Sequence, residues 1–151
     1  MITIIDLNCK EENYTWWLNI MPDEMPRLSI LPKEVRARLD YSPASLDVLE
    51  TYIRTNYTMD EMNDRKNKFA RDLFARYVGE TLRKNVPELY WSFGTEDVES
   101  PFYGIPVLLT LGLEDSVPPM TPTFWVMTLI EQSEGSFLRN RLRPEKEKKV
   151  A

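Results

Sequence analysis

The sequence predicts an α+β fold: a mainly helical single domain with a small antiparallel sheet and a C-terminal helix. Apolar residues recur at helical spacing between residues 42 and 84. Two short apolar segments, at residues 89–93 and 105–111, are strand-like. A length of 151 residues with 42% hydrophobic residues suits one domain with one buried core. We expect the domain to cover residues 1–143 and a charged tail to cover residues 144–151.

The N-terminal third carries weaker patterns. Residues 1–7 are rich in β-branched side chains, which predicts a short strand or an apolar segment laid on the core. Residues 11–20 contain a cluster of aromatic residues and are predicted to form a short helix. Pro22 and Pro26 then interrupt the chain, and Pro32 is expected to open a helical turn in LPKEVRARL.

A firmer helix is predicted from Ser42 to about Asn56. Ser42 is a suitable N-cap, and Pro43 suits the first helical position. Leucine and isoleucine then follow at helical spacing. Glu50 and Arg54 form a favourable pair on the outer face, because residues four apart are neighbours on a helix.

The strongest helix signal begins at Thr58. Thr58 and Glu61 fit a capping box, in which each residue bonds to the backbone of the other. An apolar stripe then recurs at helical spacing. We expect one helix of about 25 residues that ends near Lys84, before Pro87, with a bend as an alternative because such a length is unusual.

The rest of the chain is predicted to hold the sheet and the last helices. Leu89 to Phe93 is one strand, and the unbroken apolar run from Ile105 to Leu111 suggests a second strand buried on both faces. Pro106 is compatible only with the start or edge of a sheet. Thr121 and Pro122 are then predicted as the cap and first residue of a buried helix. A last turn or two is expected from Phe137 to Arg143.

The residue types that are missing restrict the possible chemistry. The chain has no histidine and one cysteine, Cys9, which excludes an ordinary zinc site and a Cys–His nucleophile pair. It has no GxGxxG, P-loop or GxSxG motif, and its five glycines leave little room for a phosphate-binding loop. We therefore expect a protein that is not an enzyme and that uses no cofactor and no metal.

Sequence features also bear on location. No apolar run approaches the roughly 18 to 20 residues that span a bilayer, and the first residues do not resemble a secretory signal. The single Cys9 cannot form an internal disulfide, which agrees with a reducing compartment. We expect a cytoplasmic protein that does not contact a membrane.

Charge is distributed unevenly along the chain. The net charge is −5, but residues 136–151 carry six basic and two acidic residues, a net of +4. The remaining 13 basic and 22 acidic residues give residues 1–135 a net of −9. An acidic body favours a basic protein partner and argues against binding of nucleic acid. A surface that only keeps the protein in solution is the alternative, and homo-oligomers remain possible.

Carboxylates in two loops are the main candidate binding groups. Glu96, Asp97 and Glu99 follow the first predicted strand, and Glu114 and Asp115 follow the second. Consecutive loops of an antiparallel pair lie at opposite ends of the sheet, so these clusters need not meet. This separation weakens the hypothesis of a carboxylate- and metal-dependent enzyme. The same loops suit an acidic surface for a basic protein, although solvated loop acids are the default interpretation.

Tryptophan supplies one further candidate. Trp16 and Trp17 are adjacent, so their side chains point in different directions and one of them is expected to be exposed. An exposed Trp16 would be a suitable interface anchor.

Two residues of the long helix raise a structural question. Gly79 lies on the face opposite the apolar stripe, and a helical glycine costs about 1 kcal/mol relative to alanine, so close approach of another segment is expected. Glu80 is either a docking carboxylate or, as we favour, a structural carboxylate paired with a neighbouring Arg or Lys.

Residues 46 to 111 carry a resemblance to a known group of proteins. The stretch FARDLFARYVGETLRKN is followed by Pro87, Tyr90-Trp91 and later SPFYGIP. This order resembles small bacterial immunity-type proteins of polymorphic toxin systems, which neutralise a cognate toxin by covering or distorting its active site. The resemblance implies a toxin inhibitor but transfers no individual binding residue. The acidic body favours a basic toxin domain as its partner. The alternative function is a non-catalytic adaptor or structural subunit of a secretion or phage assembly.

Overall fold

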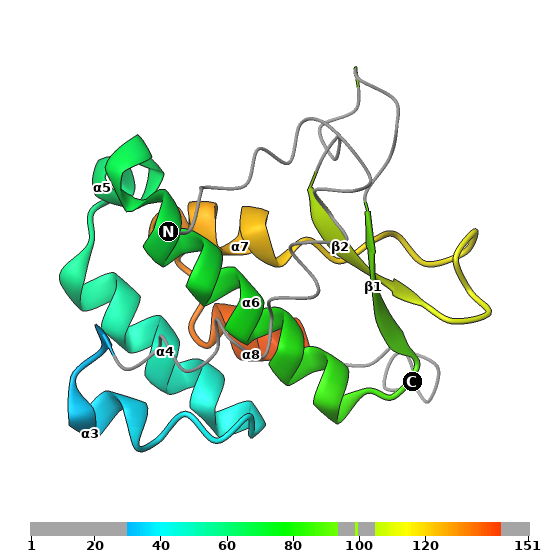
Figure 1. Cartoon of the computed structure of the whole chain (residues 1–151), viewed down its shortest axis with the longest axis horizontal. Coiled ribbons are helices and arrows are strands. Elements are labelled where there is room, and N and C mark those ends of the chain that lie inside the picture. Colours follow the sequence, from blue (N-terminus) through cyan, green and yellow to red (C-terminus); the bar gives the residue numbers. More distant parts are fainter. Residues whose placement is uncertain (1–29, 94–98, 100–104, 143–151) are drawn as a thin grey trace, which may run out of the picture.

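The computed structural model describes residues 30–93, 99 and 105–142. Figure 1 shows the arrangement of its elements and gives their labels. The elements are α3 (Lys33–Arg36), α4 (Pro43–Asn56), α5 (Met59–Asn63), the 3-10 turn η2 (Arg65–Asn67), α6 (Lys68–Asn85), β1 (Leu89–Phe93), β2 (Pro106–Thr110), α7 (Pro122–Thr128), the 3-10 turn η3 (Leu129–Glu131) and α8 (Phe137–Asn140). The α+β class, the small antiparallel sheet and the C-terminal helix predicted from the sequence are thereby confirmed.

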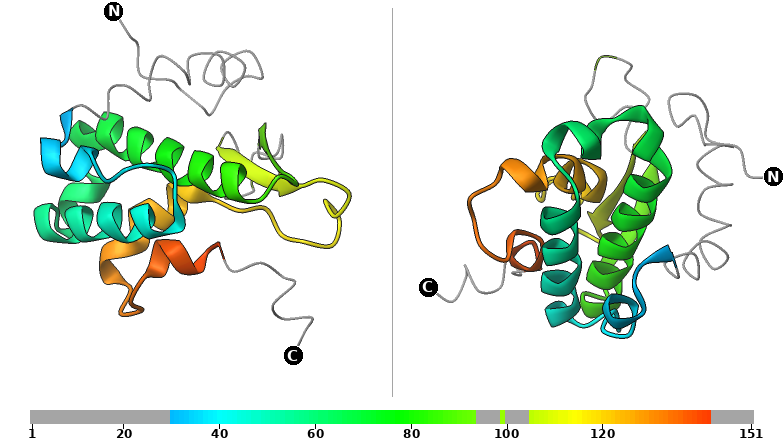
Figure 2. Two further views of the ribbon diagram at one scale, coloured as in Figure 1. Left: turned by 90° about the horizontal axis from the view of Figure 1, so that it is seen from below. Right: turned by 90° about the vertical axis from the view of Figure 1, so that its left-hand side faces the viewer.

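Helix α6 is the centre of the fold. It packs against α4, α5, α7 and β1, while α8 lies on the other side of α4 (Figure 2). Every residue from Leu73 to Leu82 is buried, including the polar ones. The apolar stripe predicted for one face is therefore only part of the buried surface. Arg76 is fully buried, and its Nε donates to Asp72 Oδ2 at 2.7 Å, which keeps a buried charge compensated.

Local sequence explains the start of α4. The Ser42 hydroxyl accepts a hydrogen bond from the Ser45 amide, and Pro43 occupies the first turn. The helix ends where Tyr57 becomes extended. Ser45 is also tied to α6, because its hydroxyl lies 2.7 Å from the Tyr77 hydroxyl in a buried hydrogen bond. The predicted boundaries of this helix are confirmed.

The prediction of one continuous helix from Thr58 to about Lys84 is wrong, because the structure has two helices, α5 and α6, separated by η2. The capping box is present, with Glu61 N donating to Thr58 Oγ1 and Thr58 N donating to Glu61 Oε1. The chain nevertheless leaves the helix at Asp64, whose backbone is extended and whose side chain accepts from Lys66 N at 2.9 Å. Arg71 holds the break by donating to the carbonyls of residues 62 and 64. Local side-chain bonds thus replace helical ones at this point.

The sheet has two antiparallel strands. Leu89 pairs with Thr110, and Phe93 pairs with Pro106, which begins β2 as its missing N–H requires. Burial on both faces, expected for the whole second strand, holds only for residues 106–108. Leu108 and Met120 exchange two backbone hydrogen bonds of 2.9 Å, so the edge of β2 is partly covered.

The C-terminal helices depend on tertiary contacts. Pro122 lies in the first turn of α7 as predicted, but the Thr121 side chain makes no capping bond and is buried instead. Helix α8 confirms the expected last turn. Its Leu138 amide donates to the Glu50 carboxylate of α4 at 2.8 Å, and Arg54 binds backbone carbonyls of the connection that precedes α8. Glu50 and Arg54 pair as predicted, but Glu50 is buried and does not lie on the outer face.

The predicted strand at residues 1–7, the predicted helix at residues 11–20 and the charged tail at residues 144–151 lie outside the described residues. Among the helices that the structure does describe, none combines the length and apolar character needed to cross a membrane.

Candidate protein-binding site

One end of the sheet forms a hydrogen-bonded projection. Beyond the Leu89–Thr110 pair, Leu111 N donates to Glu88 O at 2.8 Å and prolongs the strand pairing. The chain then turns, with Leu113 N donating to Thr110 O at 2.9 Å. The following loop extends away from the helices (Figures 1 and 2). We call Glu88, Tyr90 and residues 111–115 the sheet tip.

The turn depends on Gly112. Its φ is +83°, which is the conformation that the third residue of a type II turn requires and that glycine adopts without strain. The Leu113 carbonyl then accepts from the amides of Ser116 and Val117, at 3.0 and 2.9 Å. These bonds close the apex, and residues 111–116 are exposed to solvent.

The sheet tip exposes apolar side chains. Leu111 is 67% exposed, Leu113 40% and Tyr90 36%. Among the described residues, the remaining large exposed hydrophobic side chain is Ile30. A single exposed leucine is ordinary, but three large apolar side chains at one projecting end are typical of an interaction surface.

Glu114 and Tyr90 are linked across the tip. The Tyr90 hydroxyl donates to Glu114 Oε2 at 2.7 Å. This hydrogen bond lowers the pKa of Glu114 and raises the pKa of Tyr90 from their ordinary values. Glu114 is therefore ionised at neutral pH, and its charge is held at a fixed place beside the apolar side chains.

The sequence around the tip has no positive charge of its own. From residue 85 to residue 138 there is neither lysine nor arginine, whereas eight carboxylates are present. They are Glu88, Glu96, Asp97, Glu99, Glu114, Asp115, Glu131 and Glu134. This one segment carries a charge of −8 within a chain whose net charge is −5, although Glu134 is paired with Arg141 from outside the segment at 2.9 Å.

The predicted carboxylates do not form one cluster in the described structure. Glu114 and Asp115 are both exposed at the tip, whereas Glu99 is exposed beyond the other end of β1. A strand of five residues places these ends about 13 Å apart. Glu96, Asp97 and Trp16 lie outside the described residues. In the part of the chain that the structure describes, no three carboxylate or cysteine groups lie close enough to hold a metal ion.

Glu80 has a structural role. Arg83 donates two hydrogen bonds to its two carboxylate oxygens, both at 2.8 Å, and Trp91 Nε1 donates to Oε2 at 2.7 Å. Burial raises the pKa of Glu80, but these hydrogen bonds outweigh it, and the pKa lies below its ordinary value. The pair with Arg83 is the one that the preferred interpretation of the sequence expected, and the bond from Trp91 in addition joins α6 to β1.

The same contact explains Gly79. A Cβ atom at this position would overlap the Trp91 ring, with Cη2 and Cζ2 closer than real Cβ atoms approach and Cζ3 at 3.3 Å. The close approach of another segment, expected from a glycine inside a helix, is therefore confirmed. The approaching segment is β1 of the same chain.

Three tip residues were missed by sequence reasoning: Tyr90, Leu111 and Leu113. The sequence pattern places Tyr90 and Leu111 in strands and Leu113 in a loop, because apolar residues next to a strand normally indicate its continuation. The motif Leu-Gly-Leu-Glu-Asp, with a glycine between two leucines and acids directly after them, was the available signal of an exposed apolar turn.

Comparison of the chain with known protein families, characterised proteins and solved structures finds no match.

Proposed function

We propose that this protein binds another protein through its sheet tip, and that the partner is a basic toxin domain which it neutralises by direct binding. The observation that carries the proposal is the coincidence of exposed apolar side chains with exposed carboxylates at one projecting end of the sheet. Leu111 and Leu113 supply the apolar part, and Glu88, Glu114 and Asp115 supply the charge.

The two kinds of side chain have separate roles. Burying a leucine completely contributes about 1.5 to 3 kcal/mol, so Leu111, two-thirds exposed in the free protein, supplies about 1 to 2 kcal/mol on binding. Such anchors chiefly slow dissociation. The carboxylates attract a basic surface over a distance and raise the association rate, an effect that weakens as salt increases. A toxin inhibitor benefits from both fast association and slow dissociation.

The electrostatics favour a different protein as the partner over a second copy of this chain. Contact between two tips would place Glu88, Glu114 and Asp115 of one copy opposite the same residues of the other, and like charges repel. A basic partner removes this penalty. The same repulsion favours an inhibitor of a basic partner over a self-assembling structural subunit.

The proposal requires no cofactor and no catalytic group. We place the protein in the cytoplasm, where an inhibitor meets its toxin before the toxin acts on the producing cell. The one cysteine, Cys9, is compatible with that reducing compartment.

The test combines affinity capture from native cells with a matched pair of charge reversals. The tagged wild-type chain, the tip variant Glu114→Lys and the control variant Glu131→Lys are purified in parallel, and bound proteins are identified by mass spectrometry. Both positions are exposed carboxylates in the base-free segment, but Glu131 lies in η3, away from the tip. Wild type and control should retain one stoichiometric partner with a basic, toxin-like domain, and the tip variant should lose it.

Co-expression then separates binding from neutralisation. The wild-type chain should restore growth of cells that express the captured partner, and the tip variant should not. Equal capture by all three proteins would contradict binding at the tip. Capture without restored growth would support the adaptor alternative over an inhibitor.

A further inference from the structure

Tyr90 is the exposed aromatic residue of the sheet tip, and the strand register fixes its neighbours. Tyr90 pairs with Leu109 of β2, and the pairing continues beyond Leu89 to Glu88. Alternate residues of a strand lie on the same face, so Glu88, Tyr90 and Leu109 share one face of the sheet. Leu89 and Leu108 lie on the other face and are buried in the core. Tyr90 and Glu88 therefore lie on the solvent side, two residues or about 6.7 Å apart along the strand.

The Tyr90 ring has the properties of a seat for a cation. The side chain is 36% exposed, and its hydroxyl donates to Glu114 Oε2 at 2.7 Å. A hydroxyl that donates to a carboxylate shifts electron density into its ring. The negative face of an aromatic ring attracts cations, and this shift strengthens the attraction.

Two other rings of the chain already hold a cation. Lys84 Nζ lies 5.1 Å from the centroid of the Tyr41 ring. Arg141 Cζ lies 4.4 Å from the centroid of the Phe137 ring. Tyr90, by contrast, belongs to the segment without lysine or arginine, and in the described part of the chain no cation lies over its ring. A cation for this ring has to come from a partner.

Glu88 supplies a carboxylate on the same face. It is exposed, and among the described residues it forms no ion pair. Glu114 already accepts the hydrogen bond from Tyr90, so Glu88 is the carboxylate left for a cation that lies on the ring. Ring and carboxylate together offer two different contacts to one positively charged group.

Arginine fits this pair better than lysine. A guanidinium group is planar, so it can lie flat on an aromatic ring while its N–H groups donate sideways to a carboxylate. The ammonium group of lysine is compact and strongly hydrated, and it gains less from the ring. Leu109 and Leu111 of the same face offer an apolar surface to the methylene groups of the arginine side chain.

We propose that Tyr90 and Glu88 form a binding site for an arginine side chain of the basic partner. The guanidinium group lies on the Tyr90 ring and pairs with the Glu88 carboxylate. This inference rests on the proposed function and names the residue of the partner that the sheet tip recognises. The exposed leucines supply apolar anchoring, whereas this pair distinguishes arginine from lysine.

The experiment compares two peptides of equal charge, acetyl-(Arg)₄-amide and acetyl-(Lys)₄-amide. Each is titrated into the ¹⁵N-labelled full-length protein, and binding is followed by NMR at the amides of Tyr90 and Leu109. The arginine peptide should bind about two- to fivefold more tightly, the range for a cation on an exposed ring. It should also give nuclear Overhauser effects between its side-chain protons and the Tyr90 ring, a measurement that needs no variant.

Matched variants assign the preference to the ring and the affinity to the carboxylate. Tyr90→Val places a β-branched residue in the strand and should make the two peptides bind equally. Glu88→Gln should weaken both about two- to fivefold, as expected for an exposed ion pair. Glu131→Gln removes an exposed carboxylate in η3, away from the sheet tip, and should change neither affinity.

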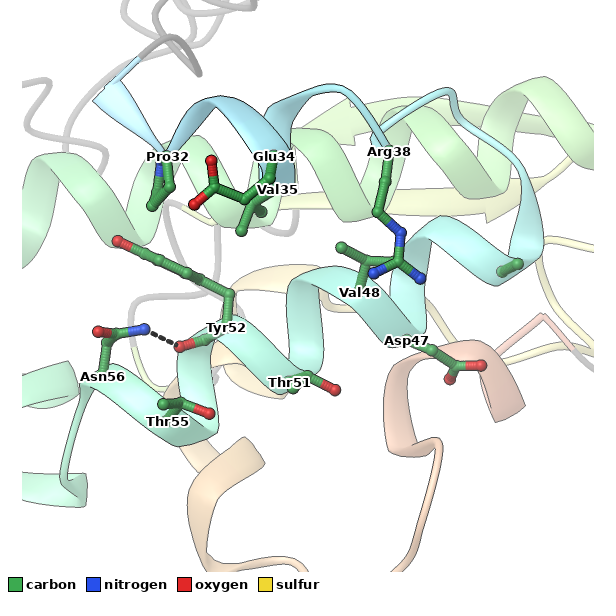
Figure 3. Close-up of a pocket in the computed structure, with 11 residues that line it drawn as sticks. Pro32, Glu34, Val35, Arg38, Asp47, Val48, Thr51, Tyr52, Thr55 and Asn56 are labelled. Carbon is green, nitrogen blue, oxygen red and sulfur yellow. Dashed lines mark hydrogen bonds between the residues drawn. The ribbon is translucent and has the colours of Figure 1, made fainter.

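A second tyrosine in the same molecule serves as an internal control. Tyr52 and Glu34 both line a groove of about 590 Å³ between α3 and α4, away from the sheet tip (Figures 1 and 3). Arg38 lines the same groove, and its positive charge opposes a cationic peptide there. The amide of Val48, in this groove, should therefore shift much less than the amide of Tyr90.

Equal binding of the two peptides at the sheet tip would overturn the inference, as would a preference for arginine that survives Tyr90→Val. The amide spectrum shows whether each variant is folded, and if Tyr90→Val is not, missing Overhauser effects at the wild-type ring would still refute the site. Loss of the captured partner in Glu114→Lys together with equal peptide binding would leave the proposed function standing and refute the arginine site. A preference for arginine without a captured partner would support the site and contradict the proposed function.

Discussion

Replacing Gly79 by alanine tests how α6 and β1 are joined. The added methyl group would overlap the Trp91 ring, and the ring cannot move without disturbing a second contact. Trp91 Nε1 donates to the buried Glu80 carboxylate at 2.7 Å, so displacement of the indole stretches or breaks this hydrogen bond. One methyl group is therefore expected to disturb both packing and a charged hydrogen bond.

The magnitude follows from three opposing contributions. Alanine favours the helix over glycine by about 1 kcal/mol. Overpacking in a closed contact costs about 1 to 3 kcal/mol, and loss of a hydrogen bond to a charged group costs about 1.5 to 3 kcal/mol. The free energy of unfolding of Gly79→Ala should therefore fall by about 1.5 to 5 kcal/mol. This is a large share of the roughly 5 to 15 kcal/mol that stabilises most domains.

The assay is urea unfolding followed by tryptophan fluorescence and circular dichroism. Gly79→Ala is measured in the wild-type chain and again in a Trp91→Val background, where the overlapping ring is absent and a β-branched residue suits the strand. In that background the same substitution should stabilise the protein by up to about 1 kcal/mol, because only its helix propensity remains. The sign of the effect should thus reverse.

The reversal makes the reasoning refutable. A neutral or stabilising Gly79→Ala in the wild-type chain would show that the ring yields without cost, and that Gly79 is not required by Trp91. Equal destabilisation in both backgrounds would mean that the helix, and not the contact with β1, is sensitive to the substitution.

Three further predictions concern charged contacts. The pKa of Glu80 is lower in the folded protein, so its ionised form stabilises the fold above the unfolded pKa, and this stabilisation is lost as the pH falls through the folded pKa. Glu80→Gln should therefore flatten the decline in the free energy of unfolding, measured with urea, between about pH 5 and pH 3. An unchanged decline would contradict the structural role of the Glu80 carboxylate. Glu50→Ala should lower the free energy of unfolding by about 1 to 3 kcal/mol and speed hydrogen exchange at the Leu138 amide. Exchange as slow as in the wild type would contradict the bond between Glu50 and this amide. Tyr90→Phe should raise the pKa of Glu114, measured by carboxyl NMR, without changing the melting temperature; an unaltered pKa would show that the bond across the tip is absent in solution.

Local patterns predicted the elements whose causes lie within a few residues. The start of α4 follows from Ser42 and Pro43, and the start of α5 follows from the Thr58–Glu61 capping box, because all the bonding partners are near in sequence. The strands were recognised by their apolar runs and by the position of Pro106 at the start of β2. These features required no knowledge of the rest of the fold.

Patterns failed where a distant or competing contact decided the outcome. The long helix breaks at Asp64 because side chains there bond to the local backbone and Arg71 reaches back from the next helix. Thr121 resembles a cap but is buried without capping α7. Short-range preference alone does not reveal which of two possible sets of hydrogen bonds is formed.

The candidate binding site was also predicted only in part from the sequence. The sequence predicted Glu114 and Asp115 as exposed acids and placed the earlier acids at the other end of the sheet, and the exposed Glu99 lies there. It did not predict Leu111 and Leu113 as exposed, because a leucine's burial depends on whether another segment covers it. The turn at Gly112 carries both leucines beyond the core, and this is visible only in three dimensions.

The sequence by itself therefore determined the α+β class, the main helix and strand positions, and the strong negative charge of the segment around the sheet. These properties depend on composition, periodicity and near-neighbour bonds. Only the tertiary structure decided that the middle of α6 is buried on all sides, that Gly79 faces Trp91, and that apolar and acidic side chains meet at one projecting end. Those outcomes depend on contacts between residues far apart in the chain, which no local pattern specifies.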